Sequence, residues 1–123
     1  MRVIPTKIHG VMDYLMAVVL LAAPAFLALN SGSREGLVLI DLGVVTVIYS
    51  LLTRYELGLF RVLPMPAHLG LDLLSGVFLA TSPWLLGFAD RIYLPHLVLG
   101  LIEIGAALLS ETHSRAERVA TPA

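Results

Sequence analysis

Residues 5–29, PTKIHGVMDYLMAVVLLAAPAFLAL, recur in altered form as residues 64–88, PMPAHLGLDLLSGVFLATSPWLLGF. An offset of 59 aligns the chemically distinctive positions of these stretches: Pro5 with Pro64, His9 with His68, Asp13 with Asp72, and Pro24 with Pro83. Farther along, an offset of 62 aligns Asp41 with Glu103. Self-similarity at a nearly fixed spacing is the signature of a repeated structural unit. The sequence therefore predicts two copies of a hairpin of two helices.

The two copies predict four helices, at residues 8–29, 36–53, 67–88 and 94–111. Each is close to the roughly 20 residues that cross the hydrocarbon core of a bilayer. All four belong to one domain, residues 1–123, whose parts are repeat one at residues 4–56, repeat two at residues 63–115 and a linker at residues 55–66. The linker carries several apolar side chains and is predicted to lie in the headgroup region.

The composition favours a membrane protein. Hydrophobic residues make up 58% of the chain and charged residues 14%, with a mean hydropathy of +0.88. The uncharged residues 14–29 leave no polar stripe that could face water in a soluble bundle. We therefore predict an all-α bundle of four transmembrane helices. The absence of cysteine excludes disulfides and thiol chemistry, and the net charge of −1 gives no support to nucleic-acid binding.

Basic residues flank the predicted spans unequally, with Arg2, Lys7, Arg54, Arg61, Arg115 and Arg118 on one side against Arg34 and Arg91 on the other. The positive-inside rule then places the N- and C-termini and the linker in the cytoplasm. Because each repeat crosses twice, both enter the membrane with the same orientation. The prediction is two parallel repeats related by a pseudo-two-fold axis along the membrane normal.

The tripeptide Ser82-Pro83-Trp84 stands at the outer end of the third predicted helix. This segment resembles the SPW-repeat family of small prokaryotic membrane proteins, in which the tripeptide lies in the first of two transmembrane helices per repeat. The first half of the chain departs from the motif, with Ala23-Pro24-Ala25 at the equivalent place. The resemblance implies this fold and a location in the prokaryotic inner membrane, and it assigns no catalytic residue. Trp84 is expected at the headgroup level, and the Ser82 hydroxyl is expected to bond a backbone carbonyl one turn earlier.

Apart from Glu111 at the last position of the fourth span, each predicted span contains a single charged residue, and all of them are acids: Asp13, Asp41, Asp72 and Glu103. An ionisable side chain in hydrocarbon costs about 2.5–3.5 kcal/mol even on insertion scales, so it normally faces the interior or a partner. His9 precedes Asp13 by four residues, as His68 precedes Asp72, which places each pair on one helix face. These six side chains form the predicted buried polar network or ion-binding site.

A metal ion is one use of this network, because two histidines and four carboxylates match the ligand inventory of di-iron bundle proteins. However, Asp41 is predicted to lie roughly 9 Å deeper in the membrane than Asp13. One compact site that uses all six residues is therefore strained. A smaller metal site of His9, Asp13, His68 and Asp72 remains feasible, and a shared site requires the carboxylates of Asp13 and Asp72 to lie within about 8 Å of each other.

One face of the fourth predicted helix is small and polar, with His96, Gly100, Glu103, Ala107 and Ser110 at alternating spacings of four and three. Small residues allow helices to approach closely, so this face is predicted to pack inside the bundle. His96 and His113, near the two ends of this helix, are predicted to be interfacial.

We predict a non-enzymatic membrane module in which the polar network is structural or supports an interaction. No nucleotide-binding glycine loop, serine elbow or H-E-x-x-H motif is present. One alternative is a small transport protein that moves protons or cations along the acids. Another is a metal or haem redox protein with His9 and His68 as ligands. The predicted partners are the lipid bilayer and either further copies of the chain or a larger membrane complex, and no cofactor is expected under the first interpretation.

Overall fold

The computed structural model describes residues 2–113, which form four α-helices. The helices are α1 (Thr6–Phe26), α2 (Arg34–Leu51), α3 (Met65–Leu85) and α4 (Leu94–Leu109). No strand occurs within the described part of the chain, where pairing is limited to two isolated bridges. The prediction of an all-helical fold with four helices is confirmed, and every helix boundary lies within three residues of the expected position.

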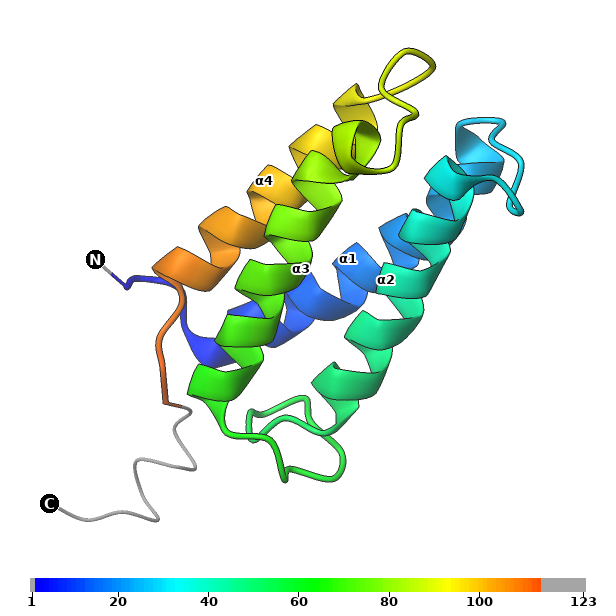
Figure 1. The fold of residues 1–123 in the computed structure, drawn as a ribbon. Helices are drawn as coiled ribbons and strands as arrows, with labels where there is room; N and C mark the ends of the chain where they lie inside the picture. The colour runs from blue at the N-terminus through cyan, green and yellow to red at the C-terminus, as the bar shows by residue number, and fades with distance from the viewer. Residues whose placement is uncertain (1, 114–123) are drawn as a thin grey trace, which may run out of the picture.

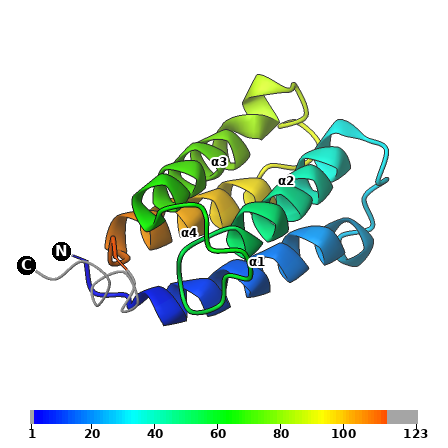
Figure 2. The ribbon, with the colours of Figure 1, turned by 90° about the horizontal axis from the view of Figure 1, so that it is seen from below.

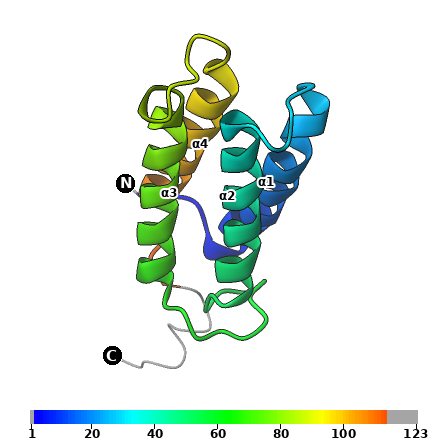
Figure 3. The same ribbon diagram turned by 45° about the vertical axis from the view of Figure 1, so that its right-hand side comes forward.

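The helices form two hairpins that lie side by side (Figures 1 and 3). Helix α1 packs along α2, α3 packs along α4, and α2 joins the hairpins by packing against α3 (Figure 2). The loops within the two hairpins lie at one end of the bundle, here called the loop end (Figure 1). The linker between α2 and α3 lies at the opposite end, here called the linker end.

Prolines set the boundaries of α1 and α3 in the same way. Pro5 and Pro64 occupy the N-cap positions with the same backbone angles, φ −61° and ψ 149°. A proline suits the start of a helix because its missing N–H has no intrahelical partner there. Pro24 and Pro83 lie in the last turns of these helices, which end at the second residue beyond each proline. The positions at which α1 and α3 end are consistent with the expected effect of these two prolines, which is to bend or end the last turn.

The buried faces of α2 and α4 show the same spacing of residues along the chain. Among the buried positions in and just after α2, residues 39, 43, 46, 50 and 53 repeat the spacing of the buried positions of α4, residues 96, 100, 103, 107 and 110, with the same alternation of four and three. Thr46 therefore occupies the place that Glu103 has in the second hairpin. The alignment of Asp41 with Glu103 is wrong, because Asp41 lies on the exposed side of α2.

Close packing of α3 on α4 depends on small residues, as the sequence predicted. A Cβ atom added to Gly100 would lie 2.6 Å from the carbonyl oxygen of Gly76, so neither helix could keep its position. The whole small and polar face of α4 is buried, including Glu103 at 7% exposure and Ala107 at 3%. The prediction that this face packs inside the bundle is confirmed.

The linker is partly folded onto the helices. Tyr55 is buried, and both Tyr55 and Leu57 pack close to Gly10 on α1. Leu59 and Phe60 are largely exposed, which suits the predicted position at a headgroup layer but does not test it.

By length and composition, one helix in the described part of the chain, α1, is long and apolar enough to cross a membrane. Helix α4 is apolar but shorter. The expectation of four spans and of cytoplasmic termini therefore remains a prediction. The predicted orientation depends partly on Arg115 and Arg118, which lie outside the described residues. The last residues of the predicted second repeat lie outside them as well.

Candidate functional site

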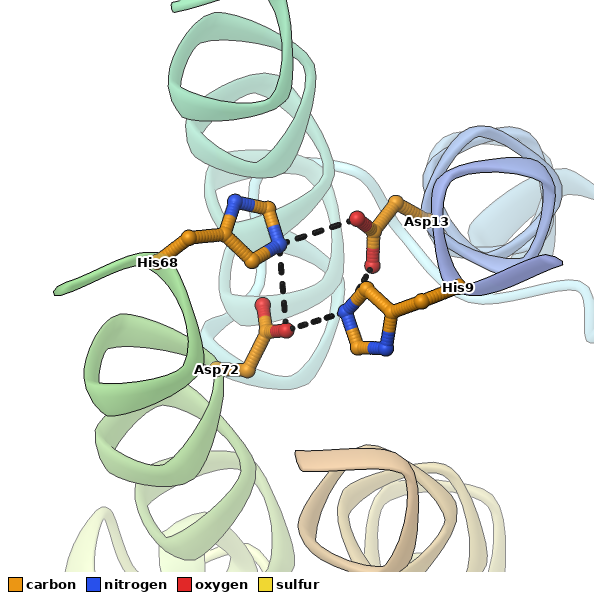
Figure 4. Close-up of side chains that lie close together, drawn as sticks. All are labelled: His9, Asp13, His68 and Asp72. Atoms are coloured by element: carbon orange, nitrogen blue, oxygen red, sulfur yellow. Dashed lines mark hydrogen bonds and ion pairs between the residues drawn. The ribbon is translucent and has the colours of Figure 1, made fainter. Parts of the chain in front are cut away.

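Two histidines and two aspartates meet near the linker end of the bundle (Figure 4). His9 and Asp13 come from α1, and His68 and Asp72 come from α3. We call these four side chains the His/Asp centre. One ligand atom from each residue lies within 4.8 Å of the others, which satisfies the distance condition for a site shared by the two hairpins.

The four side chains form a closed ring of short contacts. His9 Nε2 lies 2.8 Å from Asp72 Oδ2 and 3.1 Å from Asp13 Oδ1. His68 Nε2 lies 2.9 Å from Asp13 Oδ2 and 3.2 Å from Asp72 Oδ2. Both histidines are fully buried, and the aspartates are 7% and 4% exposed. Each imidazole therefore contacts the carboxylate on its own helix and the one on the other hairpin.

The outer nitrogen of His9 is held by a hydroxyl group from the second hairpin. Ser110 Oγ donates its proton to the carbonyl oxygen of Ala106 at 2.6 Å. The same hydroxyl lies 2.6 Å from His9 Nδ1. Because its one proton is already donated, the hydroxyl can only accept from the ring, so His9 carries a proton on Nδ1.

His68 has the same arrangement with the hairpins exchanged. Thr53 Oγ1 donates to the carbonyl oxygen of Tyr49 at 2.6 Å and lies 2.6 Å from His68 Nδ1. His68 therefore also carries a proton on Nδ1. In both rings the second nitrogen, Nε2, faces the carboxylates. It carries either a second proton, which makes the ring cationic, or a free lone pair that can bind a metal ion.

Two tyrosines complete the surroundings of the carboxylates. Tyr49 donates to Asp72 Oδ1 at 2.5 Å, and Tyr55 donates to Asp13 Oδ2 at 2.9 Å. Tyr55 lies in the linker, where burial raises the pKa of its phenol and keeps the donated proton in place. The sequence analysis missed both tyrosines. A signal was available, because a buried phenol usually finds a hydrogen-bond partner.

The donor set and its spacing fit a divalent metal ion. Adjacent ligand atoms around an ion with bonds of about 2.1 Å stand about 3.0 Å apart when the bonds meet at right angles. The four contacts of the ring, at 2.8–3.2 Å, match this separation. In addition, His68 Nε2 is buried and has no aligned hydrogen bond among the described residues despite its two close carboxylates. Imidazole and carboxylate ligands suit several first-row transition metals.

A haem between His9 and His68 does not fit. The two imidazole rings lie edge to face with centroids 5.3 Å apart. The carboxylates of Asp13 and Asp72 occupy the space between the two Nε2 atoms (Figure 4). A porphyrin placed between two axial ligands would have to displace both.

The other two predicted members of the network lie elsewhere. Glu103 is buried on α4, where Ser75 donates to its carboxylate at 3.0 Å. Asp41 is exposed on α2 and is not part of the His/Asp centre. The expectation that Asp41 faces the interior of the bundle is therefore corrected. A proton or cation pathway through all four acids would lack Asp41, the acid predicted to lie deepest in the membrane.

The motif Ser82-Pro83-Trp84 lies at the loop end and is structural in its contacts. Ser82 donates to the carbonyl oxygen of Leu79 at 2.7 Å, as expected for a hydroxyl near a proline. Trp84 is 56% exposed, and its ring centroid lies 5.6 Å from that of Tyr93. An exposed pair of amphipathic rings is typical of a membrane interface.

A second contact joins the hairpins at the loop end. Arg91 forms two hydrogen bonds with the Glu35 carboxylate, at 3.0 and 3.1 Å. His96 Nε2 lies 2.9 Å from the carbonyl oxygen of Glu35. His96 is fully buried within the protein, whereas His113 is exposed, and their predicted position at the membrane interface stays a prediction. We call the Glu35–Arg91 pair the loop-end ion pair.

Comparison with known families gives one match, to the SPW repeat domain, over residues 7–110. The chain belongs to the SPW repeat family. The match spans both hairpins, the His/Asp centre and the Ser82-Pro83-Trp84 motif, and it confirms the resemblance noted in the sequence. The family description names a repeat domain and no activity. Comparisons with curated proteins and with solved structures give no significant match.

Proposed function

We propose that this SPW repeat protein crosses the membrane as a duplicated hairpin and that its His/Asp centre binds one divalent transition-metal ion. In this proposal the ion has a structural role, because it takes two ligands from each hairpin and joins them. The observation that carries the proposal is the pair of hydroxyl contacts at Nδ1 of His9 and His68, which leave both Nε2 atoms facing the two carboxylates.

Membrane insertion of all four helices is supported by the outer surface of the bundle. Large apolar side chains are exposed on every helix, among them Val18 on α1, Ile48 on α2, Leu74 on α3 and Leu101 on α4, at 53–71%. An apolar surface of this extent is unusual for a soluble monomer and suits contact with lipid. The family match and the long apolar helix α1 agree with this placement.

Duplication about an axis along the membrane normal is supported by contacts that occur twice. The backbone of Ile4 bridges Ser110, and that of Leu63 bridges Thr53. Each of these bridges places a hydroxyl beside the histidine at the start of the opposite hairpin. The proposed symmetry exchanges His9 with His68 and Ser110 with Thr53.

Charge balance supports a divalent ion. Two neutral imidazoles and two ionised carboxylates carry a charge of −2, so one divalent ion makes the buried centre neutral. Metal-binding histidines usually donate their other N–H to a fixed acceptor, which sets the tautomer and the ring orientation. Ser110 and Thr53 supply these acceptors, and Tyr49 and Tyr55 hold the carboxylates. Structural metal sites usually have four protein ligands, whereas catalytic sites usually have three and keep one position for water or substrate.

A second candidate is a metal-free polar tie between the hairpins. It is favoured by the hydrogen bond of 2.8 Å between His9 Nε2 and Asp72 Oδ2. With both histidines protonated, the centre again has no net charge. In this form the protein would be a structural module held together by ion pairs alone.

Metal analysis of the purified protein separates these candidates. We expect the stripped protein to take up about one equivalent of at least one ion when it is offered Mn²⁺, Fe²⁺, Co²⁺ or Zn²⁺ in turn. We expect His68→Gln to lose at least about tenfold in affinity and His113→Gln, an exposed control, to keep the wild-type affinity. Near-UV circular dichroism checks that each variant is folded. Failure to bind any of the four ions, or equal uptake by folded His68→Gln, would leave the metal-free tie.

A further inference from the structure

A lateral groove separates α1 from α4, which touch only sparsely although they belong to the same bundle. Its outer part has a volume of about 470 Å³ and only apolar lining residues, which run from Val18 on α1 to Leu27 just after it and from Pro95 to Leu99 on α4. Its inner part, of about 260 Å³, reaches polar side chains near the His/Asp centre. Val19 and Leu99 line both parts, so the two form one passage, here called the α1–α4 groove.

The outside of the groove is apolar. Val18 and Val98, on its two walls, are 63% and 47% exposed, and Leu15 beside them is 61% exposed. In a membrane these walls would face acyl chains, so a molecule dissolved in the lipid could enter sideways between α1 and α4. A water-soluble ligand would meet no polar group at the entrance.

The inner part carries an acid without a countercharge. Glu103 is 7% exposed, and its carboxylate accepts a hydrogen bond from the Ser75 hydroxyl. Among residues 2–113 no lysine, arginine or histidine forms an ion pair with it. Asp13 and Asp72 line the same space, but each is already paired with His9 and His68.

An unpartnered hydroxyl faces the same space. Thr46 is 2% exposed and lines the inner groove, yet its Oγ1 has no hydrogen bond of normal geometry to any described residue. The neighbouring phenol of Tyr49 already donates its own proton to Asp72, so toward Thr46 it offers only an acceptor oxygen. A buried hydroxyl without a hydrogen-bond partner is destabilising, so a ligand that bonds Thr46 would offset this cost.

The lining determines which head group fits. Three of the four polar side chains in the inner groove are carboxyl groups, the fourth is Thr46, and none is basic. A complementary head group must therefore be cationic and must supply several N–H donors. Hydrogen bonds from an ammonium group to a carboxylate are roughly twice as strong as those between neutral groups. A carboxylate head group would add a negative charge beside three carboxyl groups, and an alcohol offers one donor and no charge.

We propose that the α1–α4 groove binds a long-chain primary amine from the lipid phase, with its ammonium group between Glu103 and Thr46 and its alkyl chain along the outer groove. The length of the passage agrees with such a ligand. Along α4, the lining runs from Pro95 to Ala106, which is about 16 Å at 1.5 Å per residue. This is about the length of an extended chain of a dozen carbon atoms. The proposal requires no ion in the His/Asp centre.

The test uses dodecylamine with a trifluoromethyl group at the tail end, added to the protein in lipid nanodiscs after treatment with a chelator. We expect a second ¹⁹F resonance that saturates at about one amine per chain. Glu103→Gln should weaken binding at least about tenfold, because the charge-assisted bonds are lost. Thr46→Val should weaken it less. Asp41→Asn, which removes an exposed acid outside the groove, should leave it unchanged.

Two further measurements test the proposed amine site if Glu103→Gln does not fold. Val98→Trp fills the outer groove without touching an acid and should also abolish the bound resonance. The alcohol with the same fluorinated tail should give no bound resonance. The proposal fails if dodecylamine gives no saturable signal, if the alcohol binds equally well, or if folded Glu103→Gln binds the amine with wild-type affinity. Because the chelated protein is used, these outcomes do not depend on whether the His/Asp centre binds metal.

Discussion

The two ends of the bundle join the same two hairpins in opposite ways. At the linker end, the His/Asp centre is buried, takes two residues from each hairpin and is oriented by hydroxyl groups from the opposite hairpin. At the loop end, Glu35 of the first hairpin, which is 8% exposed, meets Arg91 of the second, whose side chain is 53% exposed. The contact at the linker end is closed and nearly symmetric, whereas the one at the loop end is open to water at Arg91 and has no symmetric counterpart.

This difference separates a candidate site from an ordinary surface contact. An exposed ion pair contributes little because water and salt screen it. A buried set of charged groups is expensive to form and strongly destabilising to break. The cluster at the linker end is therefore the one whose polar side chains need a reason beyond packing. The following variants test whether the two ends differ as much as their geometry indicates.

The largest effect is expected for Asp72→Asn. This change leaves His9 and His68 with half of their carboxylate contacts, and removing one partner from a buried charged cluster typically costs about 3–5 kcal/mol. The measurement is thermal or denaturant unfolding in detergent, followed by the fluorescence of Trp84, the single tryptophan. Asp41→Asn is the matched control, since Asp41 is an exposed acid on α2. Equal stability of the two variants would show that the His/Asp centre does not hold the hairpins together.

A smaller effect is expected from the hydroxyl groups that orient the histidines. Thr53→Val keeps the shape of the side chain but leaves the Nδ1 proton of His68 without an acceptor, which costs about 1–3 kcal/mol. If metal binds, its affinity should fall by about 10–100-fold as well. Ser110→Ala should behave in the same way through His9. Unchanged metal affinity in both folded variants would contradict the assigned tautomers.

The smallest effect is expected at the loop end. Arg91→Gln removes the loop-end ion pair, and the melting temperature should change by about 2 °C or less. Raising the salt concentration should reduce even this difference, because exposed charges are screened within about a Debye length. A loss as large as that of Asp72→Asn would remove the distinction between the two ends.

The sequence predicted the pairs within one helix correctly because the spacing of four residues fixes them. His9 and Asp13 share a face of α1 for the same reason that His68 and Asp72 share a face of α3. Their prolines also set the helix boundaries locally. What the sequence could not show was the partners from the other hairpin, such as Ser110 for His9, since these depend on how the two hairpins dock.

The error over Asp41 has a clear physical origin. The alignment of the second helices followed acid type, a few leucines and isoleucines, and the match of Gly43 with Gly105, which pairs Asp41 with Glu103. The buried faces instead pair Thr46 with Glu103. A helix turns by about 100° per residue, so a shift of five residues moves a side chain to another face. Matching Gly43 with Gly100, which packs closely against α3, in place of Gly105 would have given the correct register.

X-ray absorption by the bound metal tests the central claim most directly. The account predicts that the metal-loaded protein shows two imidazole nitrogens and two carboxylates as ligands at about 2.0–2.2 Å, and that folded His68→Gln shows one imidazole fewer. A spectrum without imidazole scattering, or one that is unchanged in His68→Gln, would mean that any ion the protein carries is bound elsewhere.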